Sequence, residues 1–296
     1  MPFLDEIIES TESEIAAAKK ERSIGDLKRM IHDAPEVNSF AAALLSGGFG
    51  LIAEIKKRSP SAGEMRQENF DQAPAVYAKS PVVKAVSVLT NSSHFGMSVD
   101  QLSRIRPLVR KPILRKDFII KEYQVYEARA FGADAILLMA SVLSRGSLHK
   151  LFDLAQELEM DVLFEVHEKE EISKLPAGAK ICGVNSRKFM ATKRWRLAKL
   201  LLWLGFGKSS RAPDPSVELH TFSLIKELPK HLLKVAESGV RPAKASEIAQ
   251  FGYDAVLVGT SLLKAPEGVE RILSEFERAI APDCSRISPA PAIASA

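Results

Sequence analysis

The stretch "KPILRKDFIIKEYQVYEARAFGADAILLM" (residues 111–139) holds two short apolar runs on either side of a helical pattern. Apolar residues recur at helical spacing in 121–134, and Gly132 is typical of the turn that ends a helix. Both runs, 111–115 and 134–139, are nearly continuous, which is typical of strands that are covered on both faces in a parallel sheet. We therefore predict a strand, a helix and a second parallel strand.

The same unit recurs along the chain. Helical patterns, such as 244–254 with its Gly252, separate eight apolar runs: 51–56, 83–89, 111–115, 134–139, 161–166, 179–185, 232–238 and 254–259. Eight strand–helix units predict an α/β fold, the (β/α)8 or TIM barrel. An open doubly wound sheet is the alternative, but such sheets usually have fewer strands, and no G-x-G-x-x-G pattern follows the first run.

Three segments lie outside this repeat. We predict that residues 1–48 form a helical extension packed against the barrel, and that 1–280 form a single domain. Residues 281–296 are rich in Pro, Ala and Ser, which predicts a disordered tail. The insert 188–214, after the sixth run, is basic at its start and apolar in its middle. We expect a short helix around Trp195–Leu204 on the barrel rim, with a lid or a partner- or membrane-binding helix as alternatives.

Composition excludes several classes of protein. With 46% hydrophobic and 26% charged residues, the chain has ordinary globular composition. Its net charge of +4 suits an anionic small molecule and falls short of the basic surface of a nucleic-acid binder. Cys182 and Cys284 are too few and too far apart for a disulfide framework or a zinc site, so we expect a cytoplasmic protein. The start "MPFLDEIIES" lacks the basic and apolar regions of a signal peptide, and we expect no membrane partner.

Charged residues gather where the predicted strands end. In this fold, catalytic groups come from the carboxyl ends of the strands and the loops that follow them. A lysine at a strand end is usually only a solvated cap, but here two lysines and three glutamates converge on one mouth. We therefore predict acid–base chemistry at this mouth. The polar strand-end residues are Glu54, Lys56, Lys116, Glu165, Asn185, Arg187, Glu237 and Ser238.

Small-residue turns after the last two predicted strands indicate an anion site. They are "AESGV" (236–240) and "VGTSLL" (258–263). The backbone N–H groups of Gly239, Gly259 and Thr260 would form a cradle for a phosphate, at the place where barrels of this kind often hold one. Each turn alone could merely reverse the chain, but together they predict a phosphorylated small-molecule substrate.

Several stretches together resemble the indole-3-glycerol-phosphate synthase family of tryptophan biosynthesis. The most specific stretch is "LIAEIKKRSPSAG" (51–63), which carries an E-x-K pattern followed shortly by S-P-S. The resemblance runs from about residue 3 to residue 278 and is carried further by "ILRKDFII" (113–120), "LFEVHEKEE" (163–171), "GVNSRKF" (183–189) and "VAESGV" (235–240). It implies ring closure, decarboxylation and dehydration of 1-(2-carboxyphenylamino)-1-deoxyribulose 5-phosphate, without a metal or organic cofactor.

The resemblance also implies roles for the strand-end residues. Lys116 would be the general acid that polarises and protonates the ketone oxygen, and Glu165 the base of the dehydration, with Glu54 in the proton relay. Lys56 would help to bind substrate anions. Asn185, Glu237 and Ser238 would complete the catalytic centre, while Ser59 would bind the substrate carboxylate, Arg187 would orient substrate oxygens, and Phe95 and Phe118 would sandwich the anthranilate ring.

Some of these roles have plain structural alternatives. Asn185 and Ser238 could satisfy loop backbone, Arg187 could pair with Glu165 or Glu237, and Phe118 could pack between barrel and helix. Two positions depart from the family pattern: "FGMS" (95–98) replaces F-x-G-S, which leaves that loop's position open, and Thr260 replaces a serine, which should serve equally.

Two other functions compete with this one. Phosphoribosylanthranilate isomerase uses a cysteine and an aspartate, but no cysteine ends the first predicted strand. A non-catalytic phosphate-binding barrel would not need Lys116 together with Glu54 and Glu165. We expect an enzyme that acts as a monomer.

Overall fold

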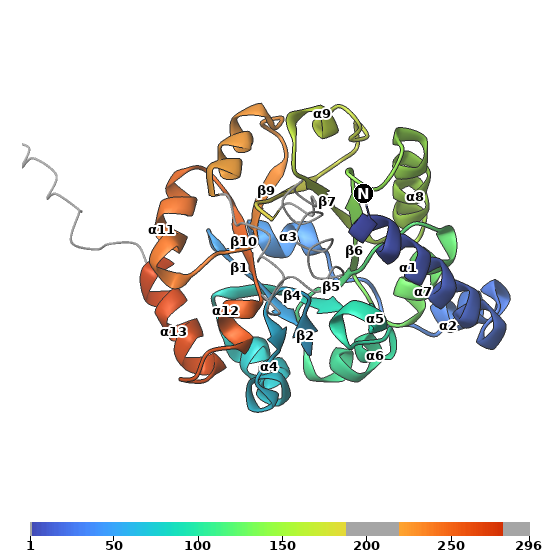
Figure 1. The fold of residues 1–296 in the computed structure, drawn as a ribbon, viewed down its shortest axis with the longest axis horizontal. Coiled ribbons are helices and arrows are strands. Elements are labelled where there is room, and N and C mark those ends of the chain that lie inside the picture. Colours follow the sequence, from blue (N-terminus) through green and yellow to red (C-terminus); the bar gives the residue numbers. More distant parts are fainter. Residues whose placement is uncertain (1, 188–218, 281–296) are drawn as a thin grey trace, which may run out of the picture.

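The computed structural model describes residues 2–187 and 219–280. Eight parallel strands close into a barrel in the order β1-β10-β9-β8-β7-β6-β5-β4. Figure 1 shows the helices arranged around these strands, so the predicted (β/α)8 barrel is confirmed. The strands are β1 (Gly50–Ile55), β4 (Val83–Leu89), β5 (Ile113–Lys116), β6 (Ala135–Met139), β7 (Asp161–Val166), β8 (Ile181–Asn185), β9 (Leu233–Glu237) and β10 (Ala255–Val258).

Helices follow the strands along the chain. A small hairpin of β2 (Arg58–Ser59) and β3 (Gly63–Glu64) precedes α4 in the loop after β1. The helical segments are α4 (Gln67–Lys79), α5 (Ser92–Phe95), α6 (Asp100–Ile105), η1 (Arg106–Leu108), α7 (Glu122–Ala130), α8 (Arg145–Glu157), α9 (Lys169–Ile172), η2 (Leu219–Glu227), α11 (Pro242–Gln250), α12 (Thr260–Leu263) and α13 (Val269–Ile280).

Two predicted helices have bounds that differ from those of their patterns. The helix expected over 121–134 ends at Ala130, and Gly132 with φ 89° turns the chain toward β6. The helix expected over 244–254 begins earlier, at Pro242, because a proline in the first turn loses no hydrogen bond and its φ is preset for a helix. Gly252, with φ 94°, repeats the closing turn.

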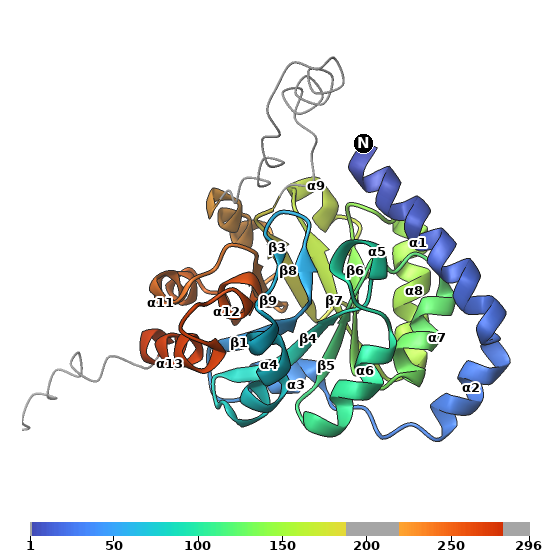
Figure 2. The ribbon, with the colours of Figure 1, turned by 60° about the horizontal axis from the view of Figure 1, so that its bottom comes forward.

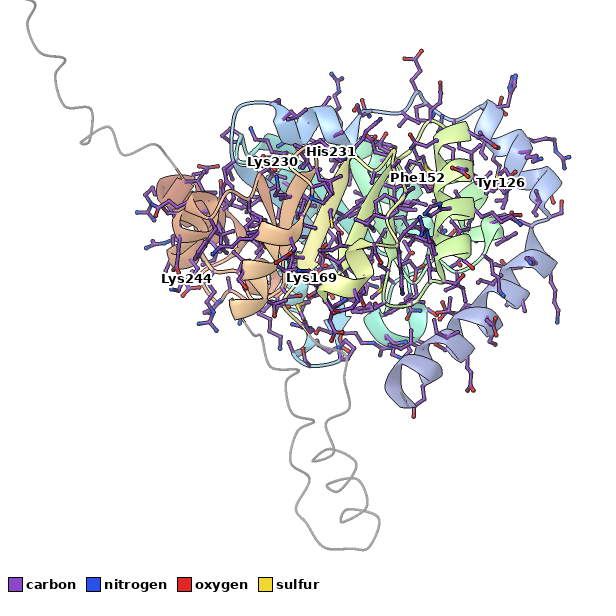
Figure 3. The ribbon with its side chains drawn as sticks, turned by 90° about the horizontal axis from the view of Figure 1, so that it is seen from above. Tyr126, Phe152, Lys169, Lys230, His231 and Lys244 are labelled. Atoms are coloured by element: carbon purple, nitrogen blue, oxygen red, sulfur yellow. The ribbon has the colours of Figure 1, made fainter. Side chains whose placement is uncertain are left out.

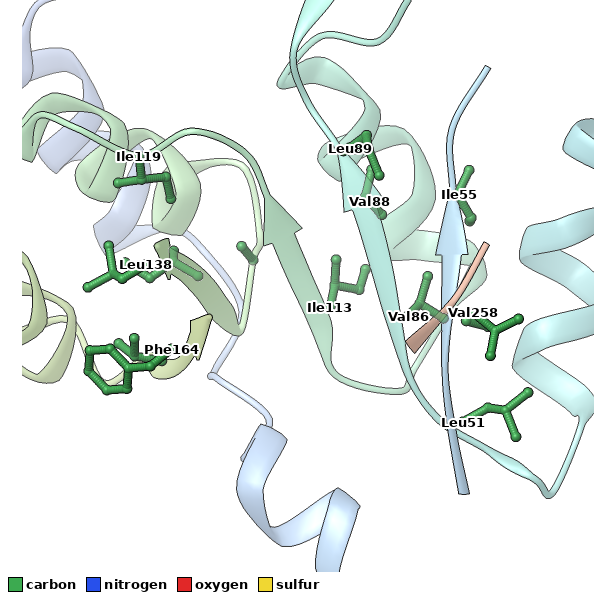
Figure 4. Packing of buried hydrophobic residues seen from close by; sticks show 14 of the residues in the cluster. Leu51, Ile55, Val86, Val88, Leu89, Ile113, Ile119, Leu138, Phe164 and Val258 are labelled. Carbon is green, nitrogen blue, oxygen red and sulfur yellow. The ribbon is translucent and has the colours of Figure 1, made fainter. Parts of the chain in front are cut away.

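Strand side chains alternate between two cores. Figure 4 shows part of the outer core, between strands and helices, where Leu51, Val86 and Phe164 are fully buried. The inner core fills the barrel and contains Ile52, Ala85, Leu114, Leu137, Leu163, Ile181, Val235 and Leu257. Successive strand residues face opposite sides, so the next inward position after each of these lies closer to the mouth.

The two ends of the barrel differ in what covers them. In Figure 3, Lys230 and His231, which precede β9, lie at one end, and Lys169, which follows β7, lies at the other. Helix α3 (Phe40–Leu45) closes the amino-terminal end, where Phe40 is fully buried in the inner core. The carboxylate of Asp161 at the start of β7 accepts a hydrogen bond from the Ala41 amide at 3.0 Å and so holds this helix in place.

The other two helices of the extension lie on one flank. Figure 2 shows α1 (Pro2–Glu21) and α2 (Ile24–His32) running along the outside of α7 and α8. The Arg22 guanidinium lies 5.1 Å from the ring centre of Phe131, and the Lys28 ammonium lies 5.1 Å from that of Tyr126.

The predicted insert 188–214, with its helix near Trp195–Leu204, and the predicted tail 281–296 lie outside the described residues. Among the helices that are described, none is both long and apolar enough to cross a membrane.

Candidate active site

The inward positions nearest the mouth carry the predicted polar residues. Glu54 follows Ile52 of the inner core on β1, Lys116 follows Leu114 on β5, and the same two-residue step gives Glu165, Asn185 and Glu237 on β7, β8 and β9. Strand pairing sets Glu165 beside Gly183 and Asn185 beside Glu237. Residues far apart in the sequence therefore meet at one end of the barrel.

Lys116 is the member of the "RKD" cluster at 115–117 that enters the mouth. Its neighbours point to the other side of the barrel wall, where the Arg115 guanidinium lies 3.0 Å from the carboxylate of Asp117 and 2.8 Å from that of Glu127 on α7. The hydroxyl of Thr90 also donates to Asp117, at 2.6 Å. This buried network anchors the end of β5 and so fixes where the Lys116 side chain begins.

Two carboxylates flank the Lys116 ammonium. Its Nζ lies 3.3 Å from Oε2 of Glu165 and 3.5 Å from Oε2 of Glu237. The Lys116 side chain is 15% exposed, while both glutamate side chains are 1% exposed. Burial alone would lower the pKa of Lys116, but the charges of Glu165 and Glu237 outweigh it and raise that pKa above its ordinary value. The ammonium is therefore firmly charged and faces the opening.

Glu165 and Glu237 differ in their charge state. Burial, and then the charge of Glu165, raises the pKa of Glu237 to about 8. Burial acts on Glu165 as well, but the charges of Lys116 and His167 outweigh it, and the neighbouring Asn185 side chain adds to their effect, so the pKa of Glu165 is lowered. At neutral pH this pair thus consists of one neutral and one ionised carboxyl group.

Two glycines make room for the carboxylates. A Cβ atom at Gly183 would lie 1.9 Å from Oε1 of Glu237, and a Cβ at Gly259 would lie 2.1 Å from Oε1 of Glu54. Each glutamate therefore extends across a glycine of a neighbouring strand or strand end. We predicted from the sequence that Gly259 binds phosphate. In the structure, its lack of a side chain also leaves space for the carboxylate of Glu54.

Lys56 and Glu54 form a buried ion pair. Lys56 Nζ lies 2.5 Å from Oε1 of Glu54, and the two side chains are 8% and 7% exposed. Burial lowers the pKa of Lys56, and the cations Arg187 and Lys116 add to this, although Glu54 opposes it. The pKa of Glu54 is lowered because Lys56 and Lys116 outweigh its burial. This pair places a second cation at the mouth, beside the first strand.

Arg187 ties the end of β8 to the loop after β1. Its Nη1 donates a hydrogen bond to Oγ of Ser61 at 3.1 Å, and that oxygen lies 3.2 Å from Oγ of Ser59. Among the described residues, no ion pair joins Arg187 to Glu165 or Glu237, so this alternative for Arg187 is not supported. The arginine and both serines therefore lie on one side of the mouth.

The two predicted aromatic residues contact the same core. Phe118 is buried in the inner cluster that fills the barrel, and Phe95 packs against that cluster from the loop after β4. Phe118 therefore lies on the mouth side of the wall and not between barrel and helix. Gly96, with φ 69°, ends α5 directly after Phe95. The loop with the unusual "FGMS" sequence thus places its phenylalanine against the inner core, although Phe95 also contacts the outer core.

The two small-residue turns lie side by side. The hydroxyl of Ser261 donates to the carbonyl oxygen of Val240 at 2.9 Å, which joins the turn after β9 to the start of α12. Ser238 and Gly239 both adopt positive φ, 71° and 70°. Positive φ is uncommon for a serine, so the backbone conformation of this turn could not be predicted from the sequence. Its binding of an anion stays a prediction.

Comparison with known proteins decides the family. A family model described as "Indole-3-glycerol phosphate synthase" matches residues 4–193. The chain belongs to the indole-3-glycerol phosphate synthase family. Similar curated proteins of that name include one from Streptomyces griseus, 37% identical over 266 residues that cover 89% of this chain and 90% of the relative. Another, from Rhodococcus jostii, is 34% identical over 97% of this chain and 100% of the relative.

Solved structures support the fold of this indole-3-glycerol phosphate synthase family member. The 3-hexulose-6-phosphate synthase of Salmonella typhimurium matches with a TM-score of 0.54 and 12% identity, over 78% of this chain and 98% of that one. A thiamine phosphate pyrophosphorylase from Pyrococcus furiosus matches with a TM-score of 0.51 and 16% identity, over 78% and 95%. At sequence identities this low, the similarity to these structures supports the barrel fold and nothing about function.

Three residues of the site were not assigned a role by the sequence. Gly183 could have been noticed as an inward glycine in a strand, because such a glycine often marks a close approach of another group. Ser61 and His167 occur in the quoted stretches "KKRSPSAG" and "LFEVHEKEE", but a motif does not say which of its members reach the mouth. Among all the described residues, including those of the site, no group of three or more His, Cys, Asp or Glu side chains is arranged to hold a metal ion.

Proposed function

We propose that this chain converts 1-(2-carboxyphenylamino)-1-deoxyribulose 5-phosphate into indole-3-glycerol phosphate, with release of carbon dioxide and water, and is thus a carbon–carbon carboxy-lyase. The observation that carries the proposal is the position of Lys116 between Glu165 and Glu237. Both carboxyl groups are buried, and at neutral pH Glu165 is ionised while Glu237 is neutral. Such a set can donate and accept protons at one site, which the successive steps of this reaction require.

Lys116 serves the first step. The aromatic carbon that bears the carboxylate attacks the ketone carbon, and a carbon–carbon bond forms as the carbonyl oxygen takes up a proton. Lys116 donates this proton, because the ammonium is held charged and the forming alkoxide is the stronger base. The bond to the carboxylate then breaks, carbon dioxide leaves, and its electron pair restores the aromatic ring.

The carboxyl groups serve the dehydration. The new hydroxyl group must leave as water while a proton is lost from the adjacent carbon or nitrogen. Glu165 is ionised and accepts that proton, whereas neutral Glu237 presents an O–H group that supplies the proton with which the hydroxyl leaves as water. Glu54, paired with Lys56, passes protons onward at the first strand.

The remaining residues bind the substrate. The N–H groups of Gly239, Gly259 and Thr260 hold the phosphate, in the two joined turns after β9 and β10. The substrate carboxylate meets Ser59 near Lys56, and the anthranilate ring lies against Phe95 and Phe118. Asn185, Arg187 and Ser238 orient the substrate oxygens. We place this enzyme in the cytoplasm as a monomer that needs no cofactor.

A single assay tests the proposal. The purified full chain is mixed with 1-(2-carboxyphenylamino)-1-deoxyribulose 5-phosphate in a buffer with a metal chelator, and the fluorescence of the indole product is followed. We expect fluorescence to appear together with one equivalent of carbon dioxide. If the substrate stays unchanged while an active synthase from another source turns it over in the same buffer, the proposal is wrong.

A further inference from the structure

We propose that His167 is a positioning residue for Glu165, and that Glu171 in turn holds the His167 ring. The inference rests on the proposed function, in which Glu165 is the base of the dehydration. It concerns a chain of three side chains, Glu171–His167–Glu165, that leads from α9 to the centre of the site. The family resemblance covers these residues but assigns a role to Glu165 alone.

The first link joins His167 to Glu165. His167 directly follows β7, two residues after Glu165, so both side chains lie on the inward face. The Nε2 atom of His167 lies 3.5 Å from Oε1 of Glu165, and the His167 side chain is 9% exposed. The other oxygen of Glu165, Oε2, faces Lys116 at 3.3 Å. Each oxygen of this carboxylate therefore has its own cationic or potentially cationic partner.

The second link joins Glu171 to His167. Oε2 of Glu171, on the four-residue helix α9, accepts a hydrogen bond from the backbone N–H of His167 at 2.7 Å. The same oxygen lies 3.8 Å from Nδ1 of the ring. One carboxylate thus holds both the backbone and the ring of His167, and it fixes the start of α9 against the end of β7.

The three side chains Glu171, His167 and Glu165 interact through their charges as well as through packing. Burial lowers the pKa of His167, but Glu171 and Glu165 outweigh it, with Lys116 on β5 as the opposing cation, and the pKa is raised above 6.5. A positive ring at Oε1 favours the ionised form of Glu165. Because Glu165 and Glu237 compete for one proton, this cation directs the proton to Glu237. His167 would thereby decide which of the two glutamates acts as the base.

The kinetic test uses His167→Asn and Glu171→Gln. For His167→Asn we expect kcat to fall about tenfold or more, as when an outer partner of a functional group is removed, with KM nearly unchanged. The acidic limb of the kcat profile should move to higher pH, because Glu165 loses a cation and its pKa rises. Glu171→Gln should shift the limb in the same direction by less, since the amide oxygen still accepts the His167 N–H. Glu170→Gln, on the exposed side of α9, is the matched control and should leave the profile unchanged.

A second measurement does not depend on activity. In NMR spectra of the full chain with labelled histidines, the signal lost in His167→Asn identifies this ring among the six histidines. We expect it to titrate above pH 6.5, and to titrate lower in Glu171→Gln. A His167 pKa below 6.5, or an unshifted acidic limb in both variants, would overturn the inference. Absence of turnover in the unmodified enzyme would instead count against the proposed function. If His167→Asn does not fold, Glu171→Gln alone decides.

Discussion

At the scale of single residues, Glu165 and Glu237 are equally buried and lie at nearly equal distances from the Lys116 ammonium, yet their pKa values move in opposite directions. The difference comes from the second neighbour of each. His167 and Asn185 favour the charged form of Glu165, whereas for Glu237 the strongest effect after burial is the charge of Glu165, which opposes its ionisation. The two residues are of the same type and are equally buried, so the charges around each glutamate determine which of them is ionised.

Replacing Lys116 tests the first step. Lys116→Ala should lower kcat by about 10²–10⁴-fold, the usual contribution of a general acid, while substrate binding stays measurable. Lys116→Arg should not restore activity, because a guanidinium is too weak an acid. Steady-state rates of indole formation and equilibrium binding of the substrate check both statements. Activity of Lys116→Ala within tenfold of the unmodified enzyme would remove this residue from its role.

Glu165→Gln provides the contrast. It should be slow at the later dehydration, so a ring-closed intermediate should accumulate in rapid-quench samples. Recovery of unreacted substrate alone would move Glu165 to the first step.

Glu237 should make stability depend on pH. Its pKa lies near 8 in the folded protein and at the ordinary 4.5 when unfolded, so the folded state holds an extra proton between these values. Its contribution is fully present below pH 4.5 and is lost as pH rises to about 8, by at most about 1.4 kcal/mol per pH unit. We expect the free energy of unfolding in urea to fall less steeply over this window in Glu237→Gln than in the unmodified protein. Equal slopes would mean that Glu237 is ionised in the folded state.

At the scale of elements, each strand serves core and site with one alternating pattern. On β5, Leu114 lies in the inner core, Arg115 joins the network behind the wall, and Lys116 reaches the mouth. The same alternation on β8 places Gly183 between Ile181 of the inner core and Asn185 of the site. A strand therefore determines the direction of its catalytic group through the residues that it buries.

Gly183→Ala tests the space across β8. The added methyl group would lie 1.9 Å from Oε1 of Glu237, so this carboxylate must leave its present position. We expect kcat to fall by more than tenfold, since a displacement of about 1 Å at a site can cost about a hundredfold. Gly146→Ala on α8 is the matched control: its Cβ meets no atom within 4 Å, and the change should raise stability by about 0.5–1 kcal/mol without affecting kcat. Equal kinetics for the two variants would show that Glu237 needs no such space.

At the scale of the whole molecule, the N-terminal extension reaches both ends of the barrel. Helix α3 closes one end, and α1 runs along the flank toward the other, as Figure 2 shows. There, Oε1 of Glu14 accepts hydrogen bonds from the hydroxyls of Ser92 and Ser93, each at 2.7 Å, and from the Ser93 amide at 3.2 Å. From the other side, Arg58 Nη2 donates to the carbonyl oxygens of the same two serines, at 3.1 and 2.8 Å. The extension thus helps to hold the loop that carries Phe95.

Glu14→Ala should therefore act on binding. Releasing the loop that contains Phe95 should raise KM several-fold, because part of the binding energy would be used to order it, with a smaller effect on kcat. Glu9→Ala, an exposed change on the same helix, should leave both constants unchanged. Steady-state kinetics of the two variants give the comparison. If KM does not respond to Glu14→Ala, the extension contributes to stability only.

The sequence by itself determined the strand order along the chain, the (β/α)8 class and the strand ends at which polar residues occur. These features are local, because burial on both faces produces apolar runs and helix ends need glycine turns. It also selected Lys116, Glu165 and Glu237 as members of one site, since the carboxyl ends of barrel strands meet at one mouth.

Only the tertiary structure decided how these residues act on one another. Four features depend on contacts between residues of different elements. They are the space at Gly183 for Glu237, the direction of Arg115 away from the mouth, the hydrogen bond from Arg187 to Ser61 and the hydrogen bond from Ser93 to Glu14. Distances across a barrel depend on strand register and side-chain direction, neither of which a one-dimensional pattern contains. The pKa values follow from the same cause, because burial and neighbouring charges exist only after the strands have closed.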